Sequence, residues 1–258
     1  MSRFVNLELG GESEEPAHQS KALVKDEAYC VSQAQAAFEG GDFERALRWF
    51  CKVLEFNPDN AAAWAGQVRM LLELGEQEEA RLWADKALER FPHDPDLLAA
   101  KAVALARAGD LEGALAFSDS AIEERGDTPY VWLARGDVLL ARGERRADYC
   151  LEKAQTLAPR NWFITWLAAR IRFYYRQFAA ALKLLQRALE ENATQFVLWL
   201  ELGRCQEALG LLGPAQVSFS QAAQLNPDCR DAALALVRLS HAGVGKRLGG
   251  WWRRLFTS

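Results

Sequence analysis

Alanine recurs at nearly equal intervals along most of this 258-residue chain. The interval is about 34 residues, and a second series of mostly small residues keeps the same period a few positions later. The first series is Ala46, Ala80, Ala114, Ala147, Ala181 and Ala215, and the second is Val53, Ala87, Ala121, Ala154, Ala188 and Ala222. A period of this length predicts a repeat architecture, in which each unit buries its apolar faces only on its neighbours.

The clearest copy of the repeat runs from Val197 to Pro227. Its marker residues are Trp199, Leu202, Gly203, Gly210, Ala215, Phe219, Ala222 and Pro227. This segment resembles the tetratricopeptide repeat, a helix–turn–helix unit of about 34 residues. The resemblance extends over residues 27–241. It implies an all-α fold, a right-handed α-solenoid of about six helical hairpins followed by a C-terminal capping helix.

The chain is expected to have three parts. Residues 1–25 mix Gly, Ser and Pro with a Glu-rich run, which is typical of a disordered acidic segment. Residues 242–258 contain four glycines, two tryptophans and four basic residues, which predicts a flexible basic aromatic tail. The repeat array takes residues 26–241, with units at about 27–60, 61–94, 95–128, 129–161, 162–195 and 196–228 and a cap at 229–241.

Three units depart from the common pattern. Gly126 stands where neighbouring units carry proline. The interval from Gly143 to Ala147 is one residue shorter than its counterparts, so we expect a tighter turn there. In the fifth unit the Arg176–Gln177 region replaces the turn glycine. Two alignments of that unit differ by one residue, so the sequence leaves open which face of its helix Arg170 occupies.

Composition and charge argue against several classes of protein. The net charge is −4, and the last eighteen residues carry four basic side chains and no acid, so the remainder is more acidic still. Binding of nucleic acid through this acidic body is not expected, because phosphate contacts need basic side chains. The sequence has no apolar run that would span a membrane, no secretory signal pattern, and five cysteines without a C-x-x-C pair. These features predict a cytoplasmic protein with reduced thiols.

No catalytic constellation is recognisable in the sequence. It lacks a glycine-rich phosphate loop, a zinc-binding H-E-x-x-H and a nucleophile elbow, and no stretch outside the repeats is long enough for an enzyme domain. We therefore expect no enzymatic activity, no cofactor, no metal and no small-molecule substrate. The resemblance implies instead a protein–protein interaction scaffold or adaptor that holds a segment of a partner protein in a concave groove.

In this repeat family the groove is lined by the first helix of each hairpin. Transferred to this chain, the resemblance gives the partner-binding positions Gln35, Phe38, Arg69, Leu72, Val103, Arg107, Tyr130, Leu133, Asp137, Tyr174, Glu201, Arg204 and Glu207. Three of them are arginines among apolar and aromatic residues, which favours a partner with carboxylates between hydrophobic residues. The sequence is equally compatible with arginines that pair with acids of the chain itself.

The tail carries a second candidate docking element, formed by Trp251, Trp252, Arg253, Arg254, Leu255 and Phe256. Three interpretations stay open: docking into a second protein as a linear motif, insertion at an anionic membrane surface, and folding back over the chain's own end. The membrane interpretation gives an alternative function for the chain, a membrane-peripheral assembly factor that the tail recruits to anionic lipid.

Overall fold

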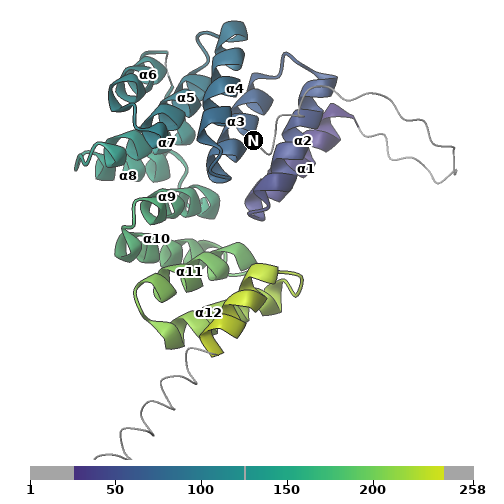
Figure 1. The fold of residues 1–258 in the computed structure, drawn as a ribbon, viewed down its shortest axis with the longest axis vertical. Helices are drawn as coiled ribbons and strands as arrows, with labels where there is room; N and C mark the ends of the chain where they lie inside the picture. Colours follow the sequence, from purple (N-terminus) through teal and green to yellow (C-terminus); the bar gives the residue numbers. More distant parts are fainter. Residues whose placement is uncertain (1–25, 125, 241–258) are drawn as a thin grey trace, which may run out of the picture. The chain divides into compact units, whose positions relative to one another are not determined.

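Helices form the regular structure in the part of the chain that the computed structural model describes, residues 26–124 and 126–240 (Figure 1). They follow one another as pairs joined by short turns, with no strand among these residues. The expected all-α helical-repeat fold is therefore confirmed. The expected acidic segment at 1–25 and the basic aromatic tail at 242–258 lie outside the described residues.

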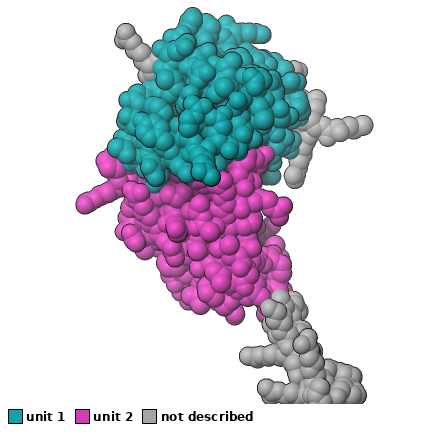
Figure 2. All heavy atoms as spheres, turned by 90° about the vertical axis from the view of Figure 1, so that its left-hand side faces the viewer, with its two compact units in different colours: residues 1–157 teal, residues 158–258 magenta. Residues whose placement is uncertain are grey.

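The chain divides into two compact units, residues 1–157 and residues 158–258 (Figure 2). Unit 1 contains the hairpins α1 (Glu27–Glu39) with α2 (Phe43–Phe56), α3 (Ala61–Glu73) with α4 (Gln77–Arg90), α5 (Pro95–Ala108) with α6 (Leu111–Glu123), and α7 (Pro129–Ala141) with α8 (Ala147–Leu157). Unit 2 contains α9 (Trp162–Tyr174) with α10 (Phe178–Glu191), and α11 (Phe196–Ala208) with α12 (Leu212–Leu225). A further helix over 230–240 follows, here called the cap helix.

Side-chain caps fix where most of the first helices begin. Asp26, Asn60, Asp94 and Thr128 each accept a hydrogen bond from the backbone N–H three residues further on. At the start of α9, Asn161 accepts from the N–H groups of Phe163 and Ile164. Each cap satisfies an N–H that a helix start leaves unpaired, which contributes about 0.5–2 kcal/mol. The caps thereby set the first residue of these five first helices, while α11 begins after Gln195 without a side-chain cap.

The turns within the hairpins depend on left-handed backbone. Gly75 and Gly210 have φ of +80° and +75°, and the turn glycines of the first, third and fourth hairpins also have positive φ. Arg176 occupies the same place in the fifth hairpin, with φ of +59°. Since a Cβ costs roughly 1–2 kcal/mol in this conformation, the arginine is strained where the other hairpins use glycine.

The shortened fourth unit differs from the sequence expectation. The turn at Gly143 is closed by Glu144 N–H donating to Leu139 O, the same bond that Glu76 makes to Leu71 in the second hairpin. The missing residue is absorbed afterwards, where Ala147 N–H donates to Glu144 O, a tighter i→i+3 contact. The second helix α8 therefore starts late and has 11 residues, while the glycine turn itself keeps its ordinary shape.

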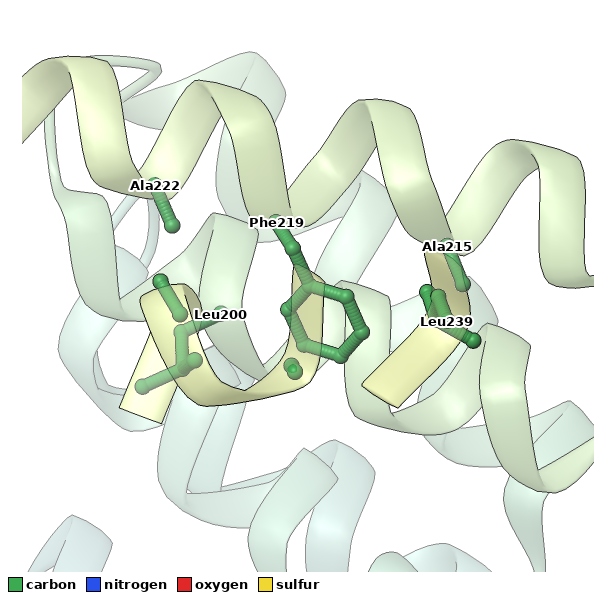
Figure 3. Packing of buried hydrophobic residues seen from close by; sticks show 7 residues of the cluster. Leu200, Ala215, Phe219, Ala222 and Leu239 are labelled. Atoms are coloured by element: carbon green, nitrogen blue, oxygen red, sulfur yellow. The ribbon is translucent and has the colours of Figure 1, made fainter. Parts of the chain in front are cut away.

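A core cluster in unit 2 shows how a hairpin closes. The cluster is Leu200 of α11, Ala215, Phe219 and Ala222 of α12, and Ala232, Ala235 and Leu239 of the cap helix (Figure 3). A Cβ added to Gly203 of α11 would lie 2.7 Å from the ring of Phe219. Only glycine allows α11 and α12 to approach this closely, because a larger side chain would push the helices apart.

Candidate interaction surface on the first helices

Arg69 is the centre of the candidate surface in unit 1. It lies on α3, and its guanidinium carbon is 4.9 Å from the ring centroid of Phe38 on α1 and 3.9 Å from that of Tyr130 on α7. Both contacts are cation–π interactions, which hold the guanidinium against the two rings. No described residue donates or accepts a hydrogen bond with the Arg69 side chain or forms an ion pair with it. Its charge is therefore held in place by aromatic rings and makes no direct ion pair with a described carboxylate, although it interacts electrostatically with Asp96.

Arg107 is in a different situation, although it lies on the neighbouring first helix α5. Its Nη2 donates to Asp137 Oδ2 on α7 at 2.7 Å, and its Nη1 donates to Leu72 O on α3 at 3.2 Å. The two charged side chains are 6% and 1% exposed. This arginine ties three first helices together and has its charge balanced inside unit 1, so a partner does not reach it.

The field of Arg69 extends to two nearby titratable groups. Burial raises the pKa of Asp96, and the hydrogen bond from Thr128 Oγ1 at 3.1 Å and the charge of Arg69 oppose that rise. Burial also raises the pKa of the Tyr130 phenol, again against the effect of Arg69. Tyr130 is therefore a neutral ring beneath a cation at physiological pH, which is the state that cation–π contact requires.

In unit 2 the first helices carry a chain of ion pairs. Glu201 on α11 is 4% exposed and accepts from Arg170 Nη1 of α9 and from Arg204 Nη1, both at 2.8 Å. Arg204 also donates to Asp231 of the cap helix at 2.6 Å. Arg170 lies over the ring of Trp166, with its guanidinium carbon 5.3 Å from the centroid. The two arginines of this cluster therefore share one buried carboxylate.

The predicted groove positions differ widely in exposure. Gln35 and Tyr174 are exposed, and Gln35 donates to Glu39 at 2.8 Å. Glu207 is half-buried and binds Arg238 at 2.7 Å. Arg69, Tyr130 and Arg204 are also half-buried, and the side chain of Arg107 is buried. The other buried positions are Phe38, Leu72, Val103, Leu133, Asp137 and Glu201. The structure brings Phe38, Arg69 and Tyr130 together, and separately Arg107 with Asp137 and Arg204 with Glu201. The predicted tail residues lie outside the described part of the chain.

Three residues of these clusters were missed by sequence reasoning: Asp96, Trp166 and Arg170. The face of Arg170 stayed open because the fifth hairpin allowed two alignments. Counting from the first residue of each first helix resolves it, because Arg69, Arg170 and Arg204 are all the ninth residue of their helices. The interval of one repeat between Arg170 and Arg204 could therefore have indicated that both occupy the same helix face.

Among the described residues, no group of three His, Cys, Asp or Glu side chains could hold a metal ion. No helix in the described ranges combines the length and apolar character needed to cross a membrane. The fold and its first-helix surfaces thus define an all-α helical-repeat protein, a fold that supports a protein–protein interaction scaffold.

Comparison with known proteins points to one repeat family. The sequence model of the tetratricopeptide repeat matches residues 31–95 and 84–129. This match and the helical-repeat fold support a tetratricopeptide repeat protein. A curated relative, Protein CTR9 homolog of Arabidopsis thaliana, is 32% identical over 112 residues, which is 42% of this chain and 10% of that protein. The matched segment therefore represents a small part of this relative.

Solved structures share the fold. A tetratricopeptide repeat protein from Parabacteroides merdae ATCC 43184 is 17% identical with a TM-score of 0.53, covering 85% of this chain and 86% of its own. A thermophilic TPR protein from Thermus thermophilus is 25% identical with a TM-score of 0.53, covering 71% and 98%. The human IFIT1 dimer with m7Gppp-AAAA is 20% identical with a TM-score of 0.51, covering 92% and 60%. The first and third likenesses show the fold alone, so the RNA bound to IFIT1 assigns no ligand here.

Proposed function

We propose that this chain is a non-enzymatic scaffold that binds an acidic segment of a partner protein on the first-helix face of unit 1, with Arg69 as the anchor. The observation that carries the proposal is the position of Arg69 over the rings of Phe38 and Tyr130, with no acid of the described residues paired to it. A guanidinium held in place in this way loses little freedom on binding, and it offers its N–H donors to a carboxylate in a bidentate geometry.

The three arginines of the predicted groove, Arg69, Arg107 and Arg204, are not equally available to a partner carboxylate. A partner carboxylate that binds Arg107 would have to displace Asp137, which is 1% exposed and strongly held. At Arg204 it would compete with Asp231, which is 60% exposed, and leave Glu201 in place. Arg69 has no acid in direct ion-pair contact among the described residues, and the nearby Asp96 accepts a hydrogen bond from Thr128 instead. A single carboxylate next to a hydrophobic or aromatic residue is therefore the proposed partner feature. Its apolar contact would come from the half-buried ring of Tyr130, since Phe38 is buried.

The experiment is a selection of random twelve-residue peptides displayed on phage against the full chain, followed by titration of the enriched peptides. We expect Asp or Glu beside an apolar residue in the enriched set. The Arg69→Gln variant should bind these peptides about tenfold to a hundredfold more weakly, because a charge-assisted bidentate contact is lost. The control Arg81→Gln removes an exposed arginine of α4, which pairs with Glu78, and should leave binding unchanged. Peptides that bind the Arg69→Gln variant as well as the unaltered chain would contradict the proposal.

The alternative function, recruitment to anionic lipid, rests on the sequence of the tail alone. Trp251, Trp252, Arg253 and Arg254 combine interfacial aromatic rings with positive charge, the pattern of weak and reversible membrane attachment. Co-sedimentation with phosphatidylserine vesicles, comparing the full chain with a chain truncated after Ala242, tests it. Lipid binding that disappears with the tail would favour this alternative, and absence of binding by both forms would rule it out. Cytoplasmic location likewise stays a prediction.

A further inference from the structure

The cap helix leaves two large apolar side chains open to solvent. Leu234 is 63% exposed and Val237 is 55% exposed, and their spacing of one helical turn puts them on the same face. The opposite face of the same helix is buried, since Ala232, Ala235 and Leu239 belong to the core cluster with Phe219 (Figure 3). The helix therefore has one covered and one uncovered apolar face.

Repeat position identifies what covers this second face elsewhere in the chain. Val237 is the eighth residue of the cap helix, counting from 230. In every described hairpin the eighth residue of the first helix is buried. These residues are Ala34, Val68, Ala102, Gly136, Ala169 and Gly203. Exposure at this position is therefore peculiar to the cap helix.

The covering element at the eighth position is the second helix of the same hairpin. A Cβ added to Gly203 would lie 2.7 Å from Phe219 of α12, and one added to Gly136 would lie 2.6 Å from Leu151 of α8. Leu234 is at the fifth position, which does not lead to the same conclusion. Its counterpart Leu200 of α11 is 6% exposed, but its counterpart Val31 of α1 is 39% exposed although α2 follows α1, so the argument depends on Val237. The exposed face of the cap helix is thus the face that a following second helix covers.

The sequence after the cap helix has the pattern of such a helix. Gly243 and Gly245 flank Val244, which stands at the repeat position of the turn glycine Gly210. Apolar residues then follow with the spacing i, i+3, i+4, i+7 and i+8, which is the stripe of an amphipathic helix. They are Leu248, Trp251, Trp252, Leu255 and Phe256. Lys246 and Arg247 precede them, and Arg253 and Arg254 lie between them. Gly249 and Gly250 also lie within this stretch, and since glycine costs about 1 kcal/mol relative to alanine inside a helix, such a helix would depend on packing against the cap helix.

We propose that residues 246–256 form the second helix of a seventh hairpin and cover Leu234 and Val237. Residues 241–245 supply a connection longer than the three-residue turn at 40–42, so the chain is long enough to turn back. Of the three interpretations of the tail, this is the one for which the described residues provide a receptor. In this proposal Trp251, Trp252 and Leu255 pack against the cap helix, and the basic residues remain at the surface. The inference is independent of the proposed role of Arg69.

Hydrogen exchange measured by mass spectrometry on the full chain tests the proposal. We expect the amides of 246–256 to exchange at least about tenfold more slowly than an unstructured peptide of the same sequence. The Trp252→Gln/Leu255→Gln variant should abolish this protection and also increase exchange in 230–240. The matched control Arg253→Gln/Arg254→Gln changes the same number of tail residues on the polar face and should retain both protections.

The reciprocal variant Leu234→Gln/Val237→Gln should release the tail while the circular dichroism of the array stays unchanged. Tail amides that exchange at the unstructured rate in the unaltered chain would overturn the proposal. So would equal loss of protection in the two tail variants. Protection that increases with protein concentration, together with a dimer mass in light scattering, would also overturn it, because a second copy would then be the covering element.

Discussion

Arg107 and Asp137 form an ion pair at 2.7 Å in which the side chains are 6% and 1% exposed. The pair joins α5 to α7, and the bond from Arg107 to Leu72 O adds α3. The inner face of unit 1 is therefore held together by a buried charge pair as well as by apolar packing.

Removing one partner of this pair should be costly. Asp137→Ala leaves the guanidinium of Arg107 buried without its carboxylate, and we expect the free energy of unfolding to fall by about 3–5 kcal/mol. Urea unfolding followed by circular dichroism measures the change. Asp59→Ala is the control, since Asp59 is 71% exposed in its pair with Arg90 and should cost under about 1 kcal/mol. Equal losses in the free energy of unfolding for the two variants would show that the buried pair stabilises the chain no more than an exposed pair does.

Arg176→Gly should stabilise the chain. Arg176 has φ of +59° at a turn position where other hairpins have glycine, and removing its Cβ relieves left-handed strain. Because glycine also increases the entropy of the unfolded chain, we expect a net gain of only about 0.5–1 kcal/mol. The reverse change at an equivalent turn, Gly210→Ala, should destabilise by a similar amount, since its φ is +75°. Thermal unfolding of both variants gives the comparison, and a destabilising Arg176→Gly would contradict the strain argument.

Gly126→Ala should destabilise unit 1 even though neighbouring units carry proline at this place. A Cβ on Gly126 would lie 2.3 Å from Ala121 O and 2.9 Å from Pro95 Cβ. We expect a loss of about 1–3 kcal/mol from this overpacking. Gly213→Ala is the matched control, because a Cβ there has nothing within 4 Å and alanine favours the helix α12. A tolerated Gly126→Ala would show that the backbone around 126 shifts without cost.

The stability of the chain should decrease with rising pH above about pH 9 in part through Cys205. Burial, with a further contribution from the charge of Glu201, raises the pKa of this thiol from 9.0 to about 12. Between these two values the unfolded chain has lost the proton that the folded chain keeps. The free energy of unfolding therefore falls as pH rises through this window. Cys205→Ala should show a smaller decrease between pH 9 and 11 than the unaltered chain, measured by urea titration, and identical pH profiles would contradict the assignment.

The repeat period accounts for what could be predicted of the fold. Alanines in register, with Gly203 against Phe219, follow directly from helices that must pack closely, so the all-α repeat fold was readable from the sequence. Local geometry was less readable. The spacing from Gly143 to Ala147 indicated a missing residue, but the bond from Ala147 to Glu144 that absorbs it depends on the whole hairpin.

The candidate site residues were harder to predict than the fold. Side chains at the same repeat position can be open to solvent in one hairpin and packed against other residues in another. Arg69, Arg170 and Arg204 share the ninth position of their helices. Arg69 contacts aromatic rings, while Arg170 and Arg204 bind Glu201. The difference arises from residues on other helices, which repeat spacing within one hairpin does not specify.

The most direct test of the proposed function is to locate a bound acidic peptide on the chain. A phage-selected peptide with a benzophenone residue next to its carboxylate is photo-cross-linked to the full chain, and the attachment site is mapped by mass spectrometry. The proposed function predicts attachment to α1, α3 or α7, around Phe38, Arg69 and Tyr130, and loss of the cross-link in Arg69→Gln. Attachment confined to unit 2, or a cross-link that Arg69→Gln leaves unchanged, would contradict it.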